Sequence, residues 1–281
     1  MSPKYPLSYN DKFLQYNGAV YGMANPTPYC TEYQRVYDYL TNKPNAAYAE
    51  RQNTLVKTLV DASLWSGKFD LFYLFAQTNN DASEAQVNWI NPGTFNCTNI
   101  SDTAFTSLEG FKGDGVNDYL NTNYNPSTEA THYTLDAASF GIYLVTDESD
   151  GNYASMGAVA GNDAILLRPR IGGATYVHMN SSTARYDNTV GNTLGMFVVT
   201  RTSLTVVSLY KDASLIMNSI NYTSTALPND DMQILAYSGG LRSTYKTAMA
   251  FVGGSLTVVD VSILTNTIEN YMDQNQKGVI P

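Results

Sequence analysis

The fold of this chain is decided between positions 109 and 125, where the sequence reads Glu109-Gly-Phe-Lys-Gly-Asp-Gly-Val-Asn-Asp-Tyr-Leu-Asn-Thr-Asn-Tyr-Asn125. Three glycines fall within six positions of this stretch, and glycine adopts backbone angles that other residues avoid. The stretch is therefore predicted to form a tight, closely packed turn. An apolar run begins at Val116 and stops before Pro126, which is typical of a short β-strand that follows such a turn.

On both sides of this stretch, short apolar runs are divided by Gly, Asn, Asp and Ser. The strands predicted from these runs lie near Val87–Ile90, Tyr119–Thr122, Ser139–Thr146, Ser155–Val159, Ala164–Pro169, Thr175–Met179, Gly195–Arg201, Leu204–Tyr210, Leu215–Ile220, Gln233–Tyr237 and Ala248–Val252. A hairpin is predicted over Leu204–Ile220, with its turn at Lys211–Ser214. Many short strands at this spacing indicate a β-sandwich or barrel rather than alternating β–α–β units.

Helices are predicted at both ends of the strand-rich region. The first begins at Thr31, which together with Gln34 matches a capping box. The second runs from about Ala46 to Leu64 and forms a helical hairpin with the first. The last helix follows Thr257, with Asp260 at the acidic third position.

The order of these elements predicts three units. The segment Asp70–Ala76 is apolar and is predicted to be a buried connector, and the polar, turn-like segment Thr78–Glu84 marks a boundary after it. The predicted units are a docking arm over residues 1–28, a helical hairpin with its connector over 29–77, and a sandwich with a C-terminal helix over 78–281.

Residues 1–28 combine four prolines with several aromatic residues. This mixture is too broken by proline for a helix and too aromatic for a solvated tail. It is predicted to be an extended docking arm, with contact residues Tyr5, Tyr9, Phe13, Tyr16 and Tyr21. Two interpretations are open, because such an arm either wraps its own domain or docks on a partner.

The composition is that of a globular protein with few charges, since hydrophobic residues make up 43% and charged residues 15%. The net charge of −9 and the lack of a Lys/Arg cluster argue against nucleic-acid binding. No apolar run approaches the roughly 20 residues of a membrane-spanning helix. The N-terminus does not have the pattern of a signal peptide, so the chain is expected to be made in, and at first to stay in, a cytoplasm.

Few residues point to catalysis or to bound metal. Neither His132 nor His178 lies in a nucleophile-elbow context, and Cys30 and Cys97 lack the spacing of metal ligands. Two reduced structural thiols are expected, with a disulfide between them as the alternative. No cofactor is predicted.

Tyrosine is abundant, with 22 residues, and aromatic rings beside polar side chains are the groups that bind sugars. The residues predicted by type and loop position to contact a glycan are Tyr153, Arg185, Tyr186 and Tyr237. A chain with this many tyrosines also places some of them near loops by chance.

The stretch from Glu109 to Asn125 resembles the Phe-x-Gly-x-x-Asp-Tyr opening of concanavalin-like jelly rolls of the laminin-G type. The run from Ala250 to Thr257 that leads into the last helix is similar to the final strand and closing helix of that family. The resemblance implies a concanavalin-like β-sandwich jelly roll, here preceded by the arm and the helical hairpin.

The same resemblance implies two kinds of site. Glycan hydrolases of this fold class carry Glu-x-Asp-x-x-Glu, but here Glu148 and Asp150 are followed by Tyr153 in place of the third acid, so no enzyme is predicted. Laminin-G-type sandwiches also carry a rim calcium site, for which the loop acids are Asp114, Asp118, Asp150, Asp163, Asp187, Asp230 and Asp231. Solvated loop acids are the favoured interpretation of these residues.

Most of the chain is similar to structural proteins of tailed bacteriophages, notably crAss-like phages. The likeness is carried by Thr31–Gln34, Leu64–Tyr73, Asn88–Pro92, Gly110–Gly115, Asn123–Ser127 and Phe251–Met272. Such proteins resemble head fibres, tail fibres or collar components that display a lectin-like jelly roll. The resemblance implies assembly into a virion, with other virion proteins and copies of the same chain as partners.

Three hypotheses follow. The first is a non-enzymatic virion protein that is anchored by its N-terminal region and displays the sandwich outward. The second is a carbohydrate-binding module that adheres to surface or mucus glycans, and it is compatible with the first. The third, ranked last, is a glycan-degrading enzyme that uses Glu148 and Asp150.

Overall fold

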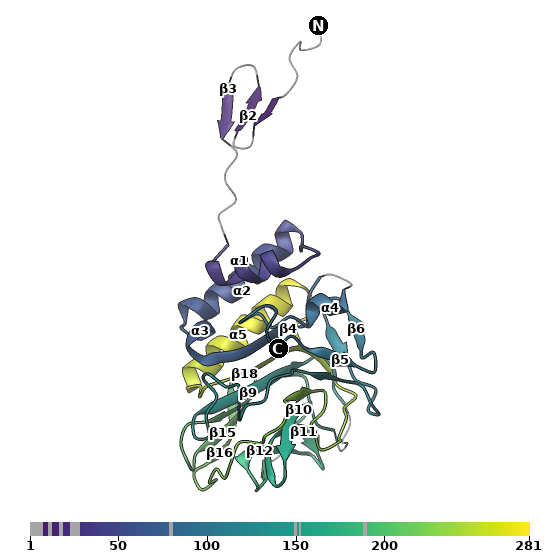
Figure 1. The fold of residues 1–281 in the computed structure, drawn as a ribbon, viewed down its shortest axis with the longest axis vertical. Helices are drawn as coiled ribbons and strands as arrows, with labels where there is room; N and C mark the ends of the chain where they lie inside the picture. The colour runs from purple at the N-terminus through teal and green to yellow at the C-terminus, as the bar shows by residue number, and fades with distance from the viewer. Residues whose placement is uncertain are drawn as a thin grey trace.

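Two antiparallel β-sheets pack face to face, and a layer of helices covers the outer face of one of them (Figure 1). This computed structural model describes residues 8–10, 13–16, 19–22, 29–78, 81–148, 151, 153–187 and 190–281. For residues 8–22, 186 and 187 it describes the backbone alone. The predicted mainly-β sandwich with a C-terminal helix is confirmed.

The seven-stranded sheet has the order β13-β12-β11-β10-β17-β8-β5. Its strands are β5 (Thr98–Ile100), β8 (Tyr119–Asn121), β10 (Met156–Ala160), β11 (Asp163–Ile171), β12 (Ala174–Ser181), β13 (Arg185–Asp187) and β17 (Gln233–Ile234). The eight-stranded sheet has the order β16-β15-β14-β9-β18-β7-β6, with β4 also paired to β18. Its strands are β4 (Phe69–Leu74), β6 (Ala104–Thr106), β7 (Gly110–Lys112), β9 (Ala138–Leu144), β14 (Gly195–Arg201), β15 (Val207–Lys211), β16 (Ser214–Ser219) and β18 (Lys246–Gly253).

The helices lie before, within and after the strands. They are α1 (Thr31–Tyr39), α2 (Ala46–Asp61), α3 (Trp65–Lys68), α4 (Ala82–Ala85) and α5 (Val258–Gln274). In the helical layer α2 contacts both α1 and α5, although α5 comes from the opposite end of the chain (Figure 1).

Strand β9 shows how the layers are held together. Its alternate residues Phe140 and Ile142 face the other sheet and join the inner core. Tyr143, the residue after Ile142, faces the helices and joins a second core with Tyr33 of α1 and Leu264 of α5. Because both faces of β9 are covered, all seven of its residues are buried, as in the central strand of a three-layer structure.

The stretch from Glu109 to Asn125 crosses from one sheet to the other, since β7 belongs to the eight-stranded sheet and β8 to the seven-stranded sheet. Gly110 has a φ of +90°, and a Cβ there would lie 1.9 Å from the Thr247 carbonyl oxygen. A Cβ at Gly113 would lie 2.1 Å from the Ser243 carbonyl oxygen. The predicted close packing is therefore confirmed, and glycine is required because two backbones approach closely, although Gly110 itself lies in strand β7.

Two predictions near β4 differ from the structure. Residues 71–76 are buried as predicted, but most of the predicted connector Asp70–Ala76 is strand β4, which pairs with β18, so the sheet begins before residue 78. Val87–Ile90 is not a strand: its Trp89 N–H donates to the Phe72 carbonyl at 2.8 Å, but no ladder follows. Asn88 takes the place of a strand partner, because its Oδ1 accepts from the Phe72 N–H at 3.2 Å.

Of the two helix starts predicted from capping residues, the structure confirms one and not the other. Thr257 is the N-cap of α5, and with Asp260 at the expected third position it forms a capping box. The box predicted at Thr31 does not form, because the N-cap of α1 is Cys30 and no side chain caps it. The Gln34 side chain instead donates to Asp38 at 2.8 Å along the helix.

Within the N-terminal segment, β1 (Ser8–Asn10), β2 (Phe13–Tyr16) and β3 (Ala19–Gly22) pair as a three-stranded antiparallel sheet. The predicted contact residues Tyr9, Phe13, Tyr16 and Tyr21 lie in these strands, whose side chains are not described. Tyr5 lies outside the described residues.

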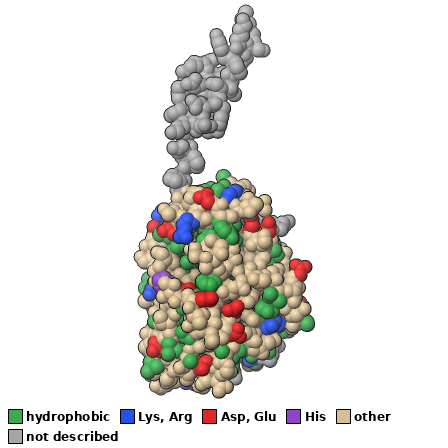
Figure 2. Space-filling model, in the orientation of Figure 1, with side chains coloured by type: hydrophobic (Ala, Val, Ile, Leu, Met, Phe, Trp, Pro, Cys, Tyr) green, Lys and Arg blue, Asp and Glu red, His purple; other side chains and the backbone are tan. Residues whose placement is uncertain are grey.

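The molecular surface carries few charges. On the face in Figure 2, acidic and basic side chains are scattered among uncharged atoms and do not gather into one patch. Among the described helices, none is long and apolar enough to cross a membrane.

Candidate functional site

A groove of about 420 Å³ opens where the helical layer meets the edge strand β4. Four parts of the chain line it: α1, the α3–β4 junction, the segment 88–95 and the segment 124–132. The lining residues are Arg35, Ser66, Phe69, Asp70, Asn88, Ile90, Asn91, Phe95, Tyr124, Glu129, Thr131 and His132. Its volume lies within the range of small-molecule binding sites, and its lining places aromatic rings beside polar groups.

Asp70 fixes one wall of the groove. Its Oδ1 accepts from the His132 N–H at 2.8 Å, and its Oδ2 accepts from the Tyr133 N–H at 2.9 Å and from the Tyr124 hydroxyl at 2.8 Å. Burial and the neighbouring Asp70 charge raise the pKa of Tyr124 far above its usual value. This carboxylate therefore ties the segment 124–132 to β4 through its two oxygens.

Asn88 fixes the opposite wall. Besides the Phe72 N–H, its Oδ1 accepts from the Ile90 N–H at 3.2 Å, and its Nδ2 donates to the Thr94 carbonyl at 3.2 Å. Asn88 is fully buried, so these bonds satisfy polar atoms that water cannot reach. The amide holds the segment 88–95 along β4.

Other groups of the groove are free for a ligand. Within the described part of the chain, no hydrogen bond or ion pair engages the side chains of Arg35, Ser66 or Asn91, all of which are exposed. Glu129 is also exposed; its Oε2 accepts from the Asn125 N–H at 2.5 Å. The half-buried Phe95 ring contributes an apolar surface beside these groups and packs edge-on against Tyr124 at 5.4 Å.

The residues predicted to contact a glycan do not line this groove. Tyr153 precedes β10 and packs against the inner core, and Tyr237 follows β17. Arg185 lies in the edge strand β13 with its guanidinium over the Tyr222 ring, and the side chain of Tyr186 is not described. Strands β11 and β12 separate β13 from β10, so the described members of this set are spread across the sheet.

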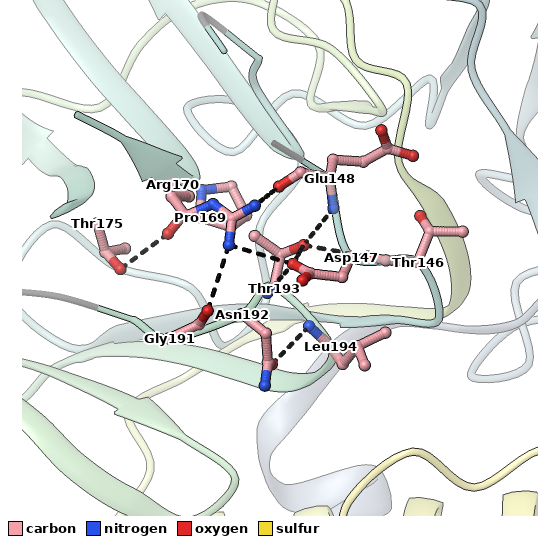
Figure 3. Close-up of polar contacts among 10 residues, drawn as sticks. All are labelled: Thr146, Asp147, Glu148, Pro169, Arg170, Thr175, Gly191, Asn192, Thr193 and Leu194. Carbon is pink, nitrogen blue, oxygen red and sulfur yellow. Dashed lines mark hydrogen bonds and ion pairs between the residues drawn. The ribbon is translucent and has the colours of Figure 1, made fainter. Parts of the chain in front are cut away.

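The acidic residues considered for catalysis are built into a loop junction. Asp147 accepts from the Thr193 N–H at 2.9 Å and lies 3.3 Å from the Arg170 guanidinium. Arg170 also donates to the Glu148 carbonyl, whereas the Glu148 carboxylate points away from both residues (Figure 3). Asp150 lies outside the described residues, so the described chain does not place a second carboxylate opposite Glu148.

Several of the loop acids considered for calcium accept hydrogen bonds from the protein itself. Asp114 accepts from three successive backbone N–H groups, those of residues 116–118, and these bonds lower the pKa of its carboxyl. Asp231 accepts from Asn121 at 3.1 Å. Among the described side chains, no three His, Cys, Asp or Glu residues come together as a ligand group. Asp150 lies outside the described residues, and the side chain of Asp187 is not described.

The two cysteines are separate free thiols. Cys30 is half-buried at the start of α1. Cys97 belongs to the inner core, where burial raises the pKa of its thiol well above the usual value. Cys97 therefore packs as a small apolar side chain.

The groove residues were not predicted as a site, although the sequence held a signal for them. Three of the sequence stretches singled out above, Leu64–Tyr73, Asn88–Pro92 and Asn123–Ser127, converge on the groove. Each stretch mixes aromatic and polar residues, and only the tertiary structure brings them together.

No protein-family model and no curated protein matches this sequence. Among solved structures, the chain is similar to the botulinum neurotoxin serotype D binding domain, with 11% identity, a TM-score of 0.50, and coverage of 71% of this chain and 51% of that one. It is also similar to Trypanosoma rangeli sialidase in complex with 2,3-difluoro-KDN, with 12% identity, a TM-score of 0.51, and coverage of 83% of this chain and 40% of the sialidase. At this identity the likeness shows a shared β-sandwich fold, which serves a binding domain in one case and an enzyme in the other.

Proposed function

We propose that this chain is a non-enzymatic, lectin-like module that binds a glycan in the groove beside β4. The observation that carries this proposal is that some polar side chains of the groove hold its walls in place, while others have no partner in the described chain. Asp70 and Asn88 are used to hold its walls, while Arg35, Asn91 and Ser66 remain free to bind hydroxyl groups beside the Phe95 ring. A free polar rim beside an aromatic face suits a sugar ring.

The sandwich fold agrees with this proposal. One of the similar structures is a toxin binding domain, and the other is a sialidase with a sugar-acid analogue bound. Hydrolysis is less well supported, because a glycosidase needs one carboxyl group as acid and a second as base or nucleophile. Of the two groove carboxylates, Asp70 already accepts three hydrogen bonds from the protein.

A glycan array with the labelled full chain tests the proposal, followed by calorimetric titration of the best-binding glycan. Arg35→Ala and Asn91→Ala are expected to weaken binding by about tenfold or more, roughly 1.4 kcal/mol. Lys57→Ala, an exposed position on α2, is the matched control and should bind as the wild type does. Absence of binding to any glycan at about 1 mM, or unchanged binding by both groove variants, would overturn it.

A place in a phage particle is a further proposal, and it is motivated by the sequence resemblance. The N-terminal segment that would provide the anchor contains the three-stranded sheet β1–β3. Light scattering on the full chain and on a chain that begins at Thr27 tests this anchor: an oligomer that becomes a monomer on truncation supports it. If both chains are monomers and the protein is absent from purified particles, a role of this segment as a virion anchor is excluded.

A further inference from the structure

Two arginines are buried in the sandwich, and their surroundings differ. Arg201 has no exposed surface; its Nη1 donates to the carbonyls of Ser203, Leu204 and Tyr222 at 2.8–3.1 Å, and its Nη2 donates to Met179 at 2.6 Å. Only its Nε lacks a partner among the described residues. Carbonyl dipoles therefore compensate most of the buried charge of Arg201.

Arg168 is 9% exposed and has no such compensation. Its Nε and Nη2 are buried, and within the described residues neither atom has a hydrogen-bond partner. The contact that the structure gives its guanidinium is with the face of the Tyr176 ring, 5.0 Å from the centroid. Nor does any described carboxylate form an ion pair with it. A buried cation in this state costs free energy that a bound anion would recover.

The position of Arg168 on β11 places it on the outer face of the seven-stranded sheet. Its neighbours Ile165 and Leu167 point into the inner core, so the alternation of the strand directs Arg168 to the opposite face. There it is paired across the ladder with Tyr176, and Leu166 is paired with His178. The groove beside β4 shares no lining residue with this cluster.

The neighbouring side chains do not offer Arg168 an acceptor. His178 Nδ1 lies 3.1 Å from the Ser181 carbonyl, which can only accept, so in the neutral ring Nδ1 carries the hydrogen. Nε2 then accepts from the Tyr176 hydroxyl at 2.8 Å. Burial and the nearby Arg168 charge both lower the pKa of His178, which keeps the ring neutral. The cluster is therefore positively charged.

The two unpartnered nitrogens lie on the same edge of the guanidinium. Nε–H and one N–H of Nη2 point in parallel from that edge, and their spacing matches the two oxygens of a carboxylate. We propose that Arg168 is the anchor of an anion site on the outer face of the seven-stranded sheet, which binds the carboxylate of an acidic ligand through this edge. Because both nitrogens are buried, the atoms that cover them must move when the anion binds, and in return the anion pairs with a buried charge that has no other partner among the described residues.

Thermal unfolding of the full chain at constant ionic strength tests this site, with sodium chloride replaced stepwise by sodium acetate or sodium glucuronate. A ligand that binds only the folded state raises the Tm with concentration, so both salts should raise it. A larger rise with glucuronate supports a site for a sugar acid, and equal rises support a site for the carboxylate alone. The proposal would be overturned if neither carboxylate raised the Tm above its value in chloride.

Variants of the two buried arginines make the test specific. Arg168→Met should raise the Tm in chloride, since it removes the unpaired charge, and should abolish the response to both carboxylates. Arg201→Met should lower the Tm but keep that response.

If Arg168→Met does not fold, Arg168→Lys keeps the charge without the paired donors, and at least tenfold more carboxylate should then be needed for the same rise in Tm. An equal response in the wild type and the Arg168 variants would assign the effect to general solvation and reject the site. Because these residues lie apart from the groove, failure here leaves the proposed glycan site intact.

Discussion

The two sheets of the sandwich differ in how many of their faces are covered. In the eight-stranded sheet, β9 is buried at all seven positions because the other sheet covers one face and the helices cover the other. In the seven-stranded sheet, β12 alternates between buried Val177 and Met179 and half-buried Tyr176 and His178. Side chains on the helix-covered sheet can change little without loss of packing. The outer face of the seven-stranded sheet, which no described helix covers, can carry ionisable groups such as Arg168.

The largest expected effect tests whether the helix-covered face matters most for stability. Phe72→Ala removes a fully buried ring that packs against Trp65, Phe69 and Trp89, so we expect a loss of about 3–5 kcal/mol in the free energy of unfolding. Tyr176→Ala on the open face should cost about 1 kcal/mol. Denaturant unfolding of both variants checks this, and similar losses would show that the two outer faces are equivalent.

The next effect concerns the edge strand of the covered sheet, where the groove lies. Asp70→Ala removes a carboxylate that accepts three hydrogen bonds, and we expect a loss of about 2–3 kcal/mol. Asp38→Ala on the exposed side of α1 is the control, with a change within about 0.5 kcal/mol. Glycan binding by Asp70→Ala should fall as well, because the wall at 124–132 loses its anchor. A variant of full stability would show that the segment is held by its packing alone.

A smaller effect tests the helical cover itself. Thr257→Ala removes the capping box of α5 and should cost about 1 kcal/mol. Thr31→Ala should cost a few tenths of a kcal/mol at most, because Thr31 does not cap α1. Parallel denaturant titrations of the two variants decide this, and equal costs would mean that the cap contributes nothing beyond helix propensity.

The smallest effect is a pH dependence on the open face. The pKa of His178 is lowered from 6.5 in the folded chain, chiefly by burial, so the unfolded chain takes up the proton first as the pH falls. The stability that this histidine contributes is therefore complete above pH 6.5 and is lost as the pH falls below it. The difference in stability between wild type and His178→Gln should shift over this range, while a constant difference from pH 8 to pH 5 would contradict the assignment.

Several features of the fold could be predicted from the sequence because their causes are local. The turn at Lys211–Ser214 forms as predicted, with Asp212 and Ala213 at φ of 51° and 62°, and strand β14 has the predicted bounds. The last helix follows from the Thr257 cap and from its apolar spacing. The crowding of glycines after Glu109 predicted a close approach that the structure shows at Gly110.

Other features depend on partners that are distant in the sequence. An apolar run such as Phe69–Leu74 becomes a strand only because β18 is available to pair with it, 175 residues or more along the chain. Asn88 likewise replaces a strand partner only because β4 lies beside it.

The chain by itself therefore determined a β-rich sandwich closed by a helix, because strand alternation, turn residues and caps act over a few neighbouring positions. Only the tertiary structure decided which polar groups are free to bind. The groove gathers residues from four separate segments, and Arg168 is distinguished from Arg201 by the partners that surround it. Whether a buried charge or a hydroxyl is satisfied depends on atoms brought from elsewhere in the chain, and no local pattern encodes that.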